Sequence, residues 1–227
     1  RRLVLRAGWA ASGHPPAGAG EPNPVGVIVS RDDGRTWRPL ALEGQADFHV
    51  MALSPADGDT LYGWSVGPRA GLFRISLKSG QAAQIPAQGL TGVLALAAHP
   101  KQAETVAAGT RTGLLLSTDG GRRWASLAFS GQPVSAVGWD SADPSRLFAY
   151  PALRAAKLMM SPDGGRTWTA LDFSAGSEDA VGWIALHPKG KGLIYLATFG
   201  SDVIRSRDDG RTWETLIKHG QPVGRAP

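Results

Sequence analysis

The stretch Ser30-Arg31-Asp32-Asp33-Gly34-Arg35-Thr36-Trp37 decides the fold of this chain, because its S-x-D-x-G-x-x-W pattern returns three more times. The other copies span residues 117–124, 161–168 and 206–213. Counted from Trp37, the tryptophans follow one another at intervals of 87, 44 and 45 residues. A repeat of this length is typical of propellers, solenoids and arrays.

The first interval is about twice the others, which predicts a further copy between them. Residues 76–83 fit, since they keep the Ser and the Gly as Ser76 and Gly80 but have lost the Asp and the Trp. The chain therefore divides into five units of one domain. They lie near residues 1–45, 46–89, 90–131, 132–176 and 177–227.

Each copy of the motif lies between two apolar runs, as residues 25–29 and 38–42 show for the first copy. Asp and Ser side chains at a turn bond nearby backbone N–H groups, and Gly adopts positive φ at little cost. The Trp then opens the next strand with a large ring to bury. The motif thus predicts a stapled hairpin. Equivalent carboxylates, one per repeat, would be spread around a ring and could not converge on one substrate.

This pattern resembles the Asp-box, or BNR repeat, of sialidases, sortilin-type receptors, some other glycoside hydrolases and photosystem assembly propellers. The resemblance covers nearly the whole chain. It implies a β-propeller whose boxes join the third and fourth strands of each blade, on the face away from the usual ligand site. It also implies a structural role for the box residues, which are Ser30, Asp32, Gly34, Trp37, Ser117, Asp119, Gly121, Trp124, Ser161, Asp163, Gly165, Trp168, Ser206, Asp208, Gly210 and Trp213.

We therefore expect an all-β propeller of about five four-stranded blades, with six blades, one trimmed or incomplete, as the alternative. An almost wholly apolar run such as residues 92–98 predicts the innermost strand, buried on both faces. The first unit opens with Leu3-Val4-Leu5, which matches a second strand. The C-terminal residues 220–223 are therefore expected to supply its missing innermost strand and close the ring.

Composition narrows the classes of function. The chain has 227 residues and a net charge of +5, but many of its arginines fall inside the boxes and are spread around the ring. Nucleic acid is therefore not an expected partner. The absence of Cys excludes disulfides and thiolate sites, and no apolar run is long enough to span a membrane. We expect a periplasmic or secreted monomer whose signal peptide is not in this chain, with no cofactor and no metal.

Candidate ligand-binding residues lie in the loops opposite the boxes. Arg69, Arg111 and Arg154 each precede their unit's box Ser by six or seven residues, so three blades offer an Arg at nearly the same place. Together with His49, they could bind an anion. The alternative is that these arginines point into water. A long insert, residues 10–24, belongs to the same set of loops.

Candidate catalytic residues are fewer. Asp47 with Glu178 or Asp179 could form the carboxylate pair of a glycoside hydrolase. The resemblance to sialidases would further require an arginine triad, a Tyr nucleophile with a Glu, and an Asp. The three tyrosines of the chain, however, fall within second-strand segments whose apolar neighbours suggest packing.

The sequence therefore favours a non-catalytic binding or assembly propeller, which holds a protein or an anionic or glycan ligand on the face opposite the boxes. The alternative is an Asp-box glycoside hydrolase of sialidase-like type.

Overall fold

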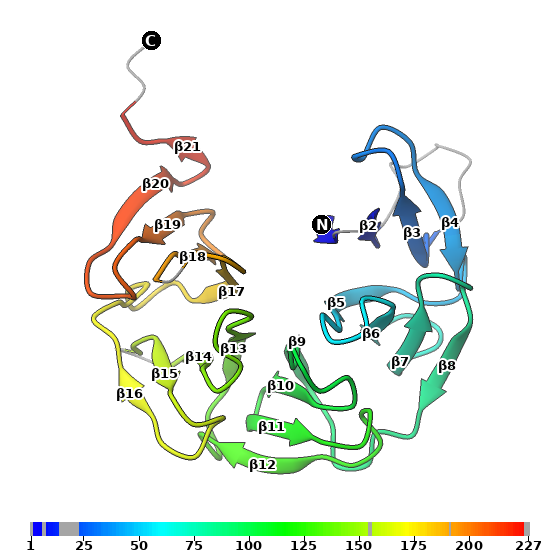
Figure 1. Ribbon diagram of the computed structural model, residues 1–227, viewed down its shortest axis with the longest axis horizontal. Coiled ribbons are helices and arrows are strands. Elements are labelled where there is room, and N and C mark those ends of the chain that lie inside the picture. Colours follow the sequence, from blue (N-terminus) through cyan, green and yellow to red (C-terminus); the bar gives the residue numbers. More distant parts are fainter. Residues whose placement is uncertain (1, 6–7, 14–22, 154–155, 191, 225–227) are drawn as a thin grey trace.

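The structure, a computed structural model, describes residues 2–5, 8–13, 23–153, 156–190 and 192–224. Within these ranges the strands form five antiparallel sheets, each built from consecutive strands, and no helix is long and apolar enough to cross a bilayer. The sheets stand around a common axis as the blades of a five-bladed β-propeller (Figure 1). The predicted fold class is confirmed, and the six-blade alternative is not what the described chain forms.

Each blade runs from its innermost strand outward. Blade 1 consists of β1 (Arg2–Leu5), β2 (Gly8–Ala11), β3 (Val27–Ser30) and β4 (Arg38–Ala41). Blade 2 consists of β5 (Phe48–Leu53), β6 (Thr60–Ser65), β7 (Gly71–Ser76) and β8 (Ala82–Ile85). Blade 3 consists of β9 (Val93–Ala98), β10 (Val106–Thr110), β11 (Gly113–Ser117) and β12 (Ala125–Ala128). Blade 4 consists of β13 (Val134–Trp139), β14 (Leu147–Pro151), β15 (Met159–Ser161) and β16 (Thr169–Ala170). Blade 5 consists of β17 (Val181–Leu186), β18 (Ile194–Thr198), β19 (Val203–Ser206), β20 (Glu214–Lys218) and β21 (Gln221–Pro222).

In blades 3 and 4 burial falls from the axis to the rim, whereas in blades 2 and 5 the second strand is more buried than the innermost one. Every residue of β13 and all but one of β9 are buried, as the apolar runs predict. Both residues of β16 are exposed, and β12 has no buried residue. Inner strands are covered on both faces by neighbouring blades, whereas outer strands face water on one side.

In blades 2, 3 and 4, one position of the second strand packs a side chain against the following blade. Tyr62, Ala107 and Phe148 occupy this position in blades 2, 3 and 4, and all three are fully buried. Phe148, for example, contacts the apolar cluster that contains Ile194 of the next blade. Tyr195 holds the same position in blade 5 but is only partly buried. Figure 1 shows why: blades 1 and 5 lie at the two ends of the arc and do not stack on each other.

The expected exchange of strands between the two chain ends is wrong. β1, which contains Leu3-Val4-Leu5, is the innermost strand of blade 1 and pairs with β2. β21 pairs with β20 of its own blade instead of with blade 1. The turn between them explains this pairing, because His219 and Gly220 both have positive φ, as a two-residue type I′ hairpin requires.

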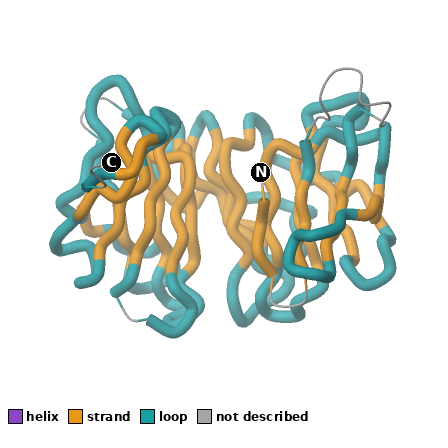
Figure 2. The backbone as a smooth tube through the Cα atoms, turned by 90° about the horizontal axis from the view of Figure 1, so that it is seen from above, coloured by secondary structure: helices purple, strands orange, loops and turns teal. Residues whose placement is uncertain are grey.

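The blade topology separates two sets of loops, which appear in Figure 2 as two layers at opposite ends of the strands. We call the first set the box face. It carries the boxes and the turns that join the first and second strands. The second set, the loop face, carries the segments that join the second and third strands and those that lead into the next blade. Backbone bonds such as Gly120 N–H to Glu104 O (2.8 Å) and Gly164 N–H to Ser145 O (2.7 Å) tie the boxes to the neighbouring turns.

Candidate functional site

The four boxes share one hydrogen-bond pattern. In the third box, Ser161 Oγ donates to Asp163 Oδ1 (2.8 Å) and accepts from Gly165 N (2.7 Å), while Asp163 Oδ1 also accepts from Thr167 N (2.8 Å). The equivalent bonds occur in the other three boxes. The box Trp donates its ring N–H to the box Gly carbonyl in three of the four, with Trp213 as the exception. Each carboxylate is thus occupied in holding its own loop.

These hydrogen bonds keep the box carboxyls ionised. The Thr36 hydroxyl, with the Thr36 N–H, lowers the pKa of Asp32 from 3.8 to about 2. The N–H and hydroxyl of Thr167 do the same for Asp163, and the hydroxyl and N–H of Thr212 for Asp208. In the second box the Arg123 N–H lowers the pKa of Asp119. A carboxylate with so low a pKa is a poor general acid near neutral pH, which supports a structural role.

The degenerate box lacks the Asp of the motif, and a carboxylate from another loop makes hydrogen bonds to it instead. Asp59, in the turn between β5 and β6, accepts from Ser76 Oγ (3.0 Å) and from Lys78 N (2.8 Å). Gly80 of this box has φ +73°, and a Cβ there would lie 2.7 Å from Leu40 O of blade 1. Sequence spacing could not reveal Asp59, because it lies outside the motif.

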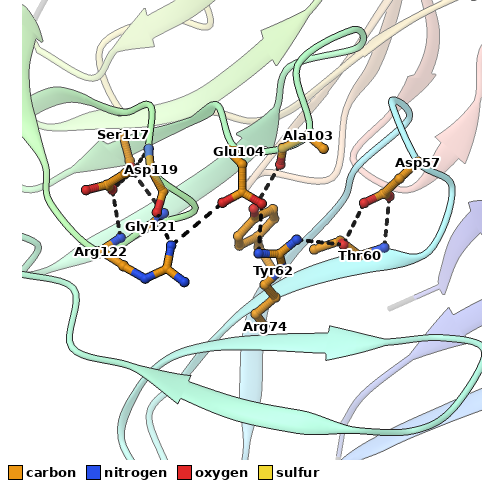
Figure 3. Close-up of polar contacts among 10 residues, drawn as sticks. All are labelled: Asp57, Thr60, Tyr62, Arg74, Ala103, Glu104, Ser117, Asp119, Gly121 and Arg122. Carbon is orange, nitrogen blue, oxygen red and sulfur yellow. Dashed lines mark hydrogen bonds and ion pairs between the residues drawn. The ribbon is translucent and has the colours of Figure 1, made fainter.

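A polar cluster joins blades 2 and 3 on the box face (Figure 3). Tyr62 donates its hydroxyl to Ala103 O (2.9 Å), and Arg74 pairs with Glu104 (2.8 Å), which also lies 3.8 Å from Arg122. Burial raises the pKa of Tyr62 to about 12. A neutral, buried phenol bonded to a backbone carbonyl is not an available nucleophile.

The other two tyrosines lie in second strands, Tyr150 in β14 and Tyr195 in β18. Tyr150 is buried, donates to Ala156 O (3.4 Å) and accepts from Ala175 N (3.1 Å). None of the three tyrosines lines the cavity described below.

Of the predicted arginines, Arg69 and Arg111 lie on the loop face, and neither lines the axial cavity. Arg69 is exposed, donates to Gln45 Oε1 (3.3 Å) and stacks over the Phe73 ring at 5.1 Å. Arg111 is exposed, and its side chain lies against Gly92. Arg154 lies outside the described residues, as does most of the long insert.

The predicted carboxylates differ in their surroundings and in the groups that they contact. Asp47 is buried at the entry to β5, where its Oδ2 lies 3.0 Å from Nε2 of the half-exposed His49. Asp179 accepts two backbone bonds through Oδ1, from Ala180 N (2.8 Å) and Gly200 N (2.9 Å). Glu178 is exposed in the same segment.

A cavity of about 440 Å³ lies on the axis, bounded by the innermost strands of blades 2 to 5. Its apolar wall includes Val50, Met51, Leu96 and Val137. Of the predicted residues, Asp47 and His49 line it; Glu178, Asp179, Arg69 and Arg111 do not.

Sequence reasoning missed the aromatic part of this cavity. Trp183 on β17 and Phe199 in the β18–β19 turn both line it, with ring centroids 5.7 Å apart and planes tilted by 57°. Gly182 leaves room for this pair, because a Cβ there would lie 3.2 Å from the Phe199 ring. The signal available in the sequence was the aromatic residue that directly follows the second-strand segment of the last unit.

Exposed apolar side chains gather on the loop face. Phe199 is 58% exposed, and its N–H bonds Ala180 O (3.1 Å). Val66, 50% exposed, makes the equivalent bond to Asp47 O (2.9 Å) in blade 2. In blade 4 the exposed Leu153 follows the residue at this position, and in blade 3 Arg111 occupies it. The repeat thus sets an exposed apolar side chain at or next to the same place in blades 2, 4 and 5, and an arginine at that place in blade 3.

Comparison with solved structures defines the class of protein, a β-propeller. The chain is similar to the GH74 enzyme of Niastella koreensis, with TM-score 0.69 and 17% identity over 97% of this chain and 37% of that one. It is also similar to the extracellular domain of a putative hybrid two component system from B. thetaiotaomicron, with TM-score 0.62 and 14% identity over 95% of this chain and 27% of that one. A third similar structure is an auxiliary nutrient binding protein from Bacteroides thetaiotaomicron, with TM-score 0.60 and 16% identity over 79% and 43%.

At these identities the likeness concerns the fold alone, and the chain spans less than half the length of each of the three. Searches against protein-family models and against curated proteins find no match.

Proposed function

We propose that this chain is a non-catalytic binding propeller of the Asp-box type, which holds a protein partner on its loop face. The observation that carries this proposal is the position of its exposed apolar side chains. Among the described residues five large hydrophobic side chains are exposed. Val66, Leu153 and Phe199 lie in loop-face turns, and Trp183 lies beside Phe199 in the axial cavity. The fifth, Val223, lies beyond the C-terminal hairpin turn on the outer edge of blade 5, where its N–H bonds Leu216 O (2.9 Å) in the middle of β20.

An apolar group of this kind, set around a cavity and bordered by polar residues, is typical of a protein-binding surface. Aromatic residues carry much of the affinity of such surfaces. Arg69 and Arg111 would then form part of the charged rim, where they could meet acidic groups of the partner. An anionic or glycan ligand has less support, because neither arginine lines the cavity.

The alternative is a glycoside hydrolase that uses Asp47. Its support is that Asp47 lines the cavity. A hydrolase of this class needs a second carboxyl group about 5–10 Å away, on the other side of the substrate. Glu178 and Asp179 do not line the cavity, and Asp179 is engaged with two backbone N–H groups. The similar structures include both an enzyme and a nutrient binding protein, so likeness does not favour either function.

We further propose that the protein is periplasmic or secreted and acts as a monomer. A Cys-free chain is compatible with this location, since it has no thiol to be oxidised there.

Crosslinking from two positions tests the binding proposal. A benzophenone amino acid replaces Phe199 in one variant and Val223 in the other, two side chains of nearly equal exposure (58% and 56%). We expect one partner protein to be captured through position 199 and not through position 223. Equal capture at both positions would contradict the proposal.

A panel of fluorogenic glycosides tests the alternative. We expect no turnover above that of the Asp47→Ala variant. Robust turnover by the wild type that Asp47→Ala abolishes would replace the binding function with the hydrolase.

A further inference from the structure

We infer that the axial cavity receives a basic side chain of the partner, an ammonium or guanidinium group on an apolar stem. This inference rests on the proposed function and specifies the chemistry of the group that enters the cavity.

The charge of the cavity wall favours a cation. Among the described residues that line it, Asp47 and His49 are the two with titratable side chains, and Lys and Arg do not occur. The Asp47 side chain is only 12% exposed. A carboxylate in so apolar a wall attracts a cation more strongly than one in water, and it repels an anion for the same reason.

Asp47 is held in place before any ligand arrives. Its N–H donates to Ser65 Oγ (3.1 Å), and its carbonyl accepts from Val66 N (2.9 Å). Gly67 packs so closely that a Cβ there would lie 2.8 Å from Cβ of Asp47. These contacts fix the Asp47 backbone and Cβ, and Oδ2 lies 3.0 Å from His49 Nε2, so the carboxylate loses little conformational freedom when a ligand binds.

The aromatic pair adds a second attraction for a cation. Ring faces bind ammonium and guanidinium groups within about 6 Å of their centroids, Trp best of all. Trp183 and Phe199 remain 41% and 58% exposed, so part of each side chain faces solvent. The apolar wall of Val50, Met51 and Leu96 would cover the stem. The cavity, at about 440 Å³, is within the usual size of ligand sites.

Three probes of matched shape test the charge preference by calorimetric titration of the wild-type chain. They are 4-phenylbutylammonium, 4-phenylbutan-1-ol and 4-phenylbutyrate. We expect the ammonium compound to bind at least about tenfold more tightly than the alcohol, as a charge-assisted hydrogen bond allows, and the carboxylate to bind most weakly. Equal binding of the ammonium compound and the alcohol, or no binding of any of the three, would overturn the inference.

Two variants locate the effect. Asp47→Asn should remove the difference between ammonium and alcohol, whereas Asp172→Asn, at an exposed carboxylate that does not line the cavity, should preserve it. If Asp47→Asn still binds the ammonium compound more tightly than the alcohol, the site lies elsewhere and the inference is contradicted.

A peptide pair tests the source of the cation. Ac-Ala-Phe-Lys-Ala-amide should bind, and its Nε-acetylated form should not. Binding of 4-phenylbutylammonium but of neither peptide would overturn the assignment to a partner's side chain. The inference and the proposed function can fail separately. If a partner is captured at position 199 but none of the probes binds, the inference of a basic side chain is refuted and the proposed function is not.

Discussion

Replacement of Phe148 tests how the blades hold together. Phe148 is fully buried where blade 4 packs against Ile194, Leu196 and Ile204 of blade 5. Phe148→Ala removes a whole ring from this interface, and buried Phe-to-Ala changes cost about 3–5 kcal/mol. A chain of this size loses about 2–4 °C in Tm per kcal/mol, so Tm should fall by roughly 6–20 °C.

Tyr195 provides the matched control, because it holds the same repeat position in blade 5 with no following blade stacked on it. Since its ring is already partly exposed, Tyr195→Ala should cost about 1–2 kcal/mol by the apolar area that remains buried. Differential scanning calorimetry of the two variants measures the contrast, with far-UV circular dichroism to verify that both fold. An equal loss of Tm in the two variants would refute the reasoning, since Tyr195 would then be covered in solution.

Three other predictions concern the boxes. Trp168→Ala removes a partly buried ring from the cluster between blades 3 and 4 and should lower the free energy of unfolding by about 2–4 kcal/mol in chemical denaturation. Lys78→Ala, in the degenerate box, should lower it little. Equal losses would contradict the structural role assigned to the box Trp. Asp59→Ala should destabilise the chain more than Lys78→Ala, because two hydrogen bonds to the degenerate box are lost. An equal Tm in the two variants would show that Asp59 does not stabilise this box. The Tm should fall as pH falls from about 4 to about 2. The reason is that the box carboxyls that include Asp32 have a folded pKa of about 2 against an ordinary 3.8, so they stabilise the fold only while ionised. An unchanged Tm over this range would show that these carboxylates contribute nothing to stability.

The repeat made the fold predictable from the sequence. The spacing of the box tryptophans and the apolar runs fixed the blade type and the place of the degenerate copy at Ser76. The chain ends were not predictable in the same way. Pairing of β21 with β20 depends on a hairpin turn at His219 and Gly220. Residues 220–223 repeat the Gly-Gln-Pro-Val of residues 131–134, which lead into an innermost strand, and this similarity does not reveal the turn.

The candidate site was predictable only in part. Asp47 and His49 were identified because they lie where the loop face must be, yet their nearness to Trp183 and Phe199 depends on the curvature of the ring. The three arginines appeared equivalent because each lies six or seven residues before the box Ser of its unit. Backbone bonds show that Arg111 takes the position of Val66, whereas Arg69 lies three residues further on. Function in this chain is therefore sought where the blades differ, since the boxes that they share are occupied in holding their own loops.

The affinity of the captured partner for two variants tests the central claim, that binding rests on the loop face, most directly. Phe199→Ser removes an exposed apolar side chain from that face, and Val223→Ser removes one of similar exposure from the C-terminal hairpin. Removal of an aromatic anchor costs about 2 kcal/mol or more, so Kd should rise at least about thirtyfold for Phe199→Ser and stay near the wild-type value for Val223→Ser. An unchanged Kd for Phe199→Ser would contradict the account.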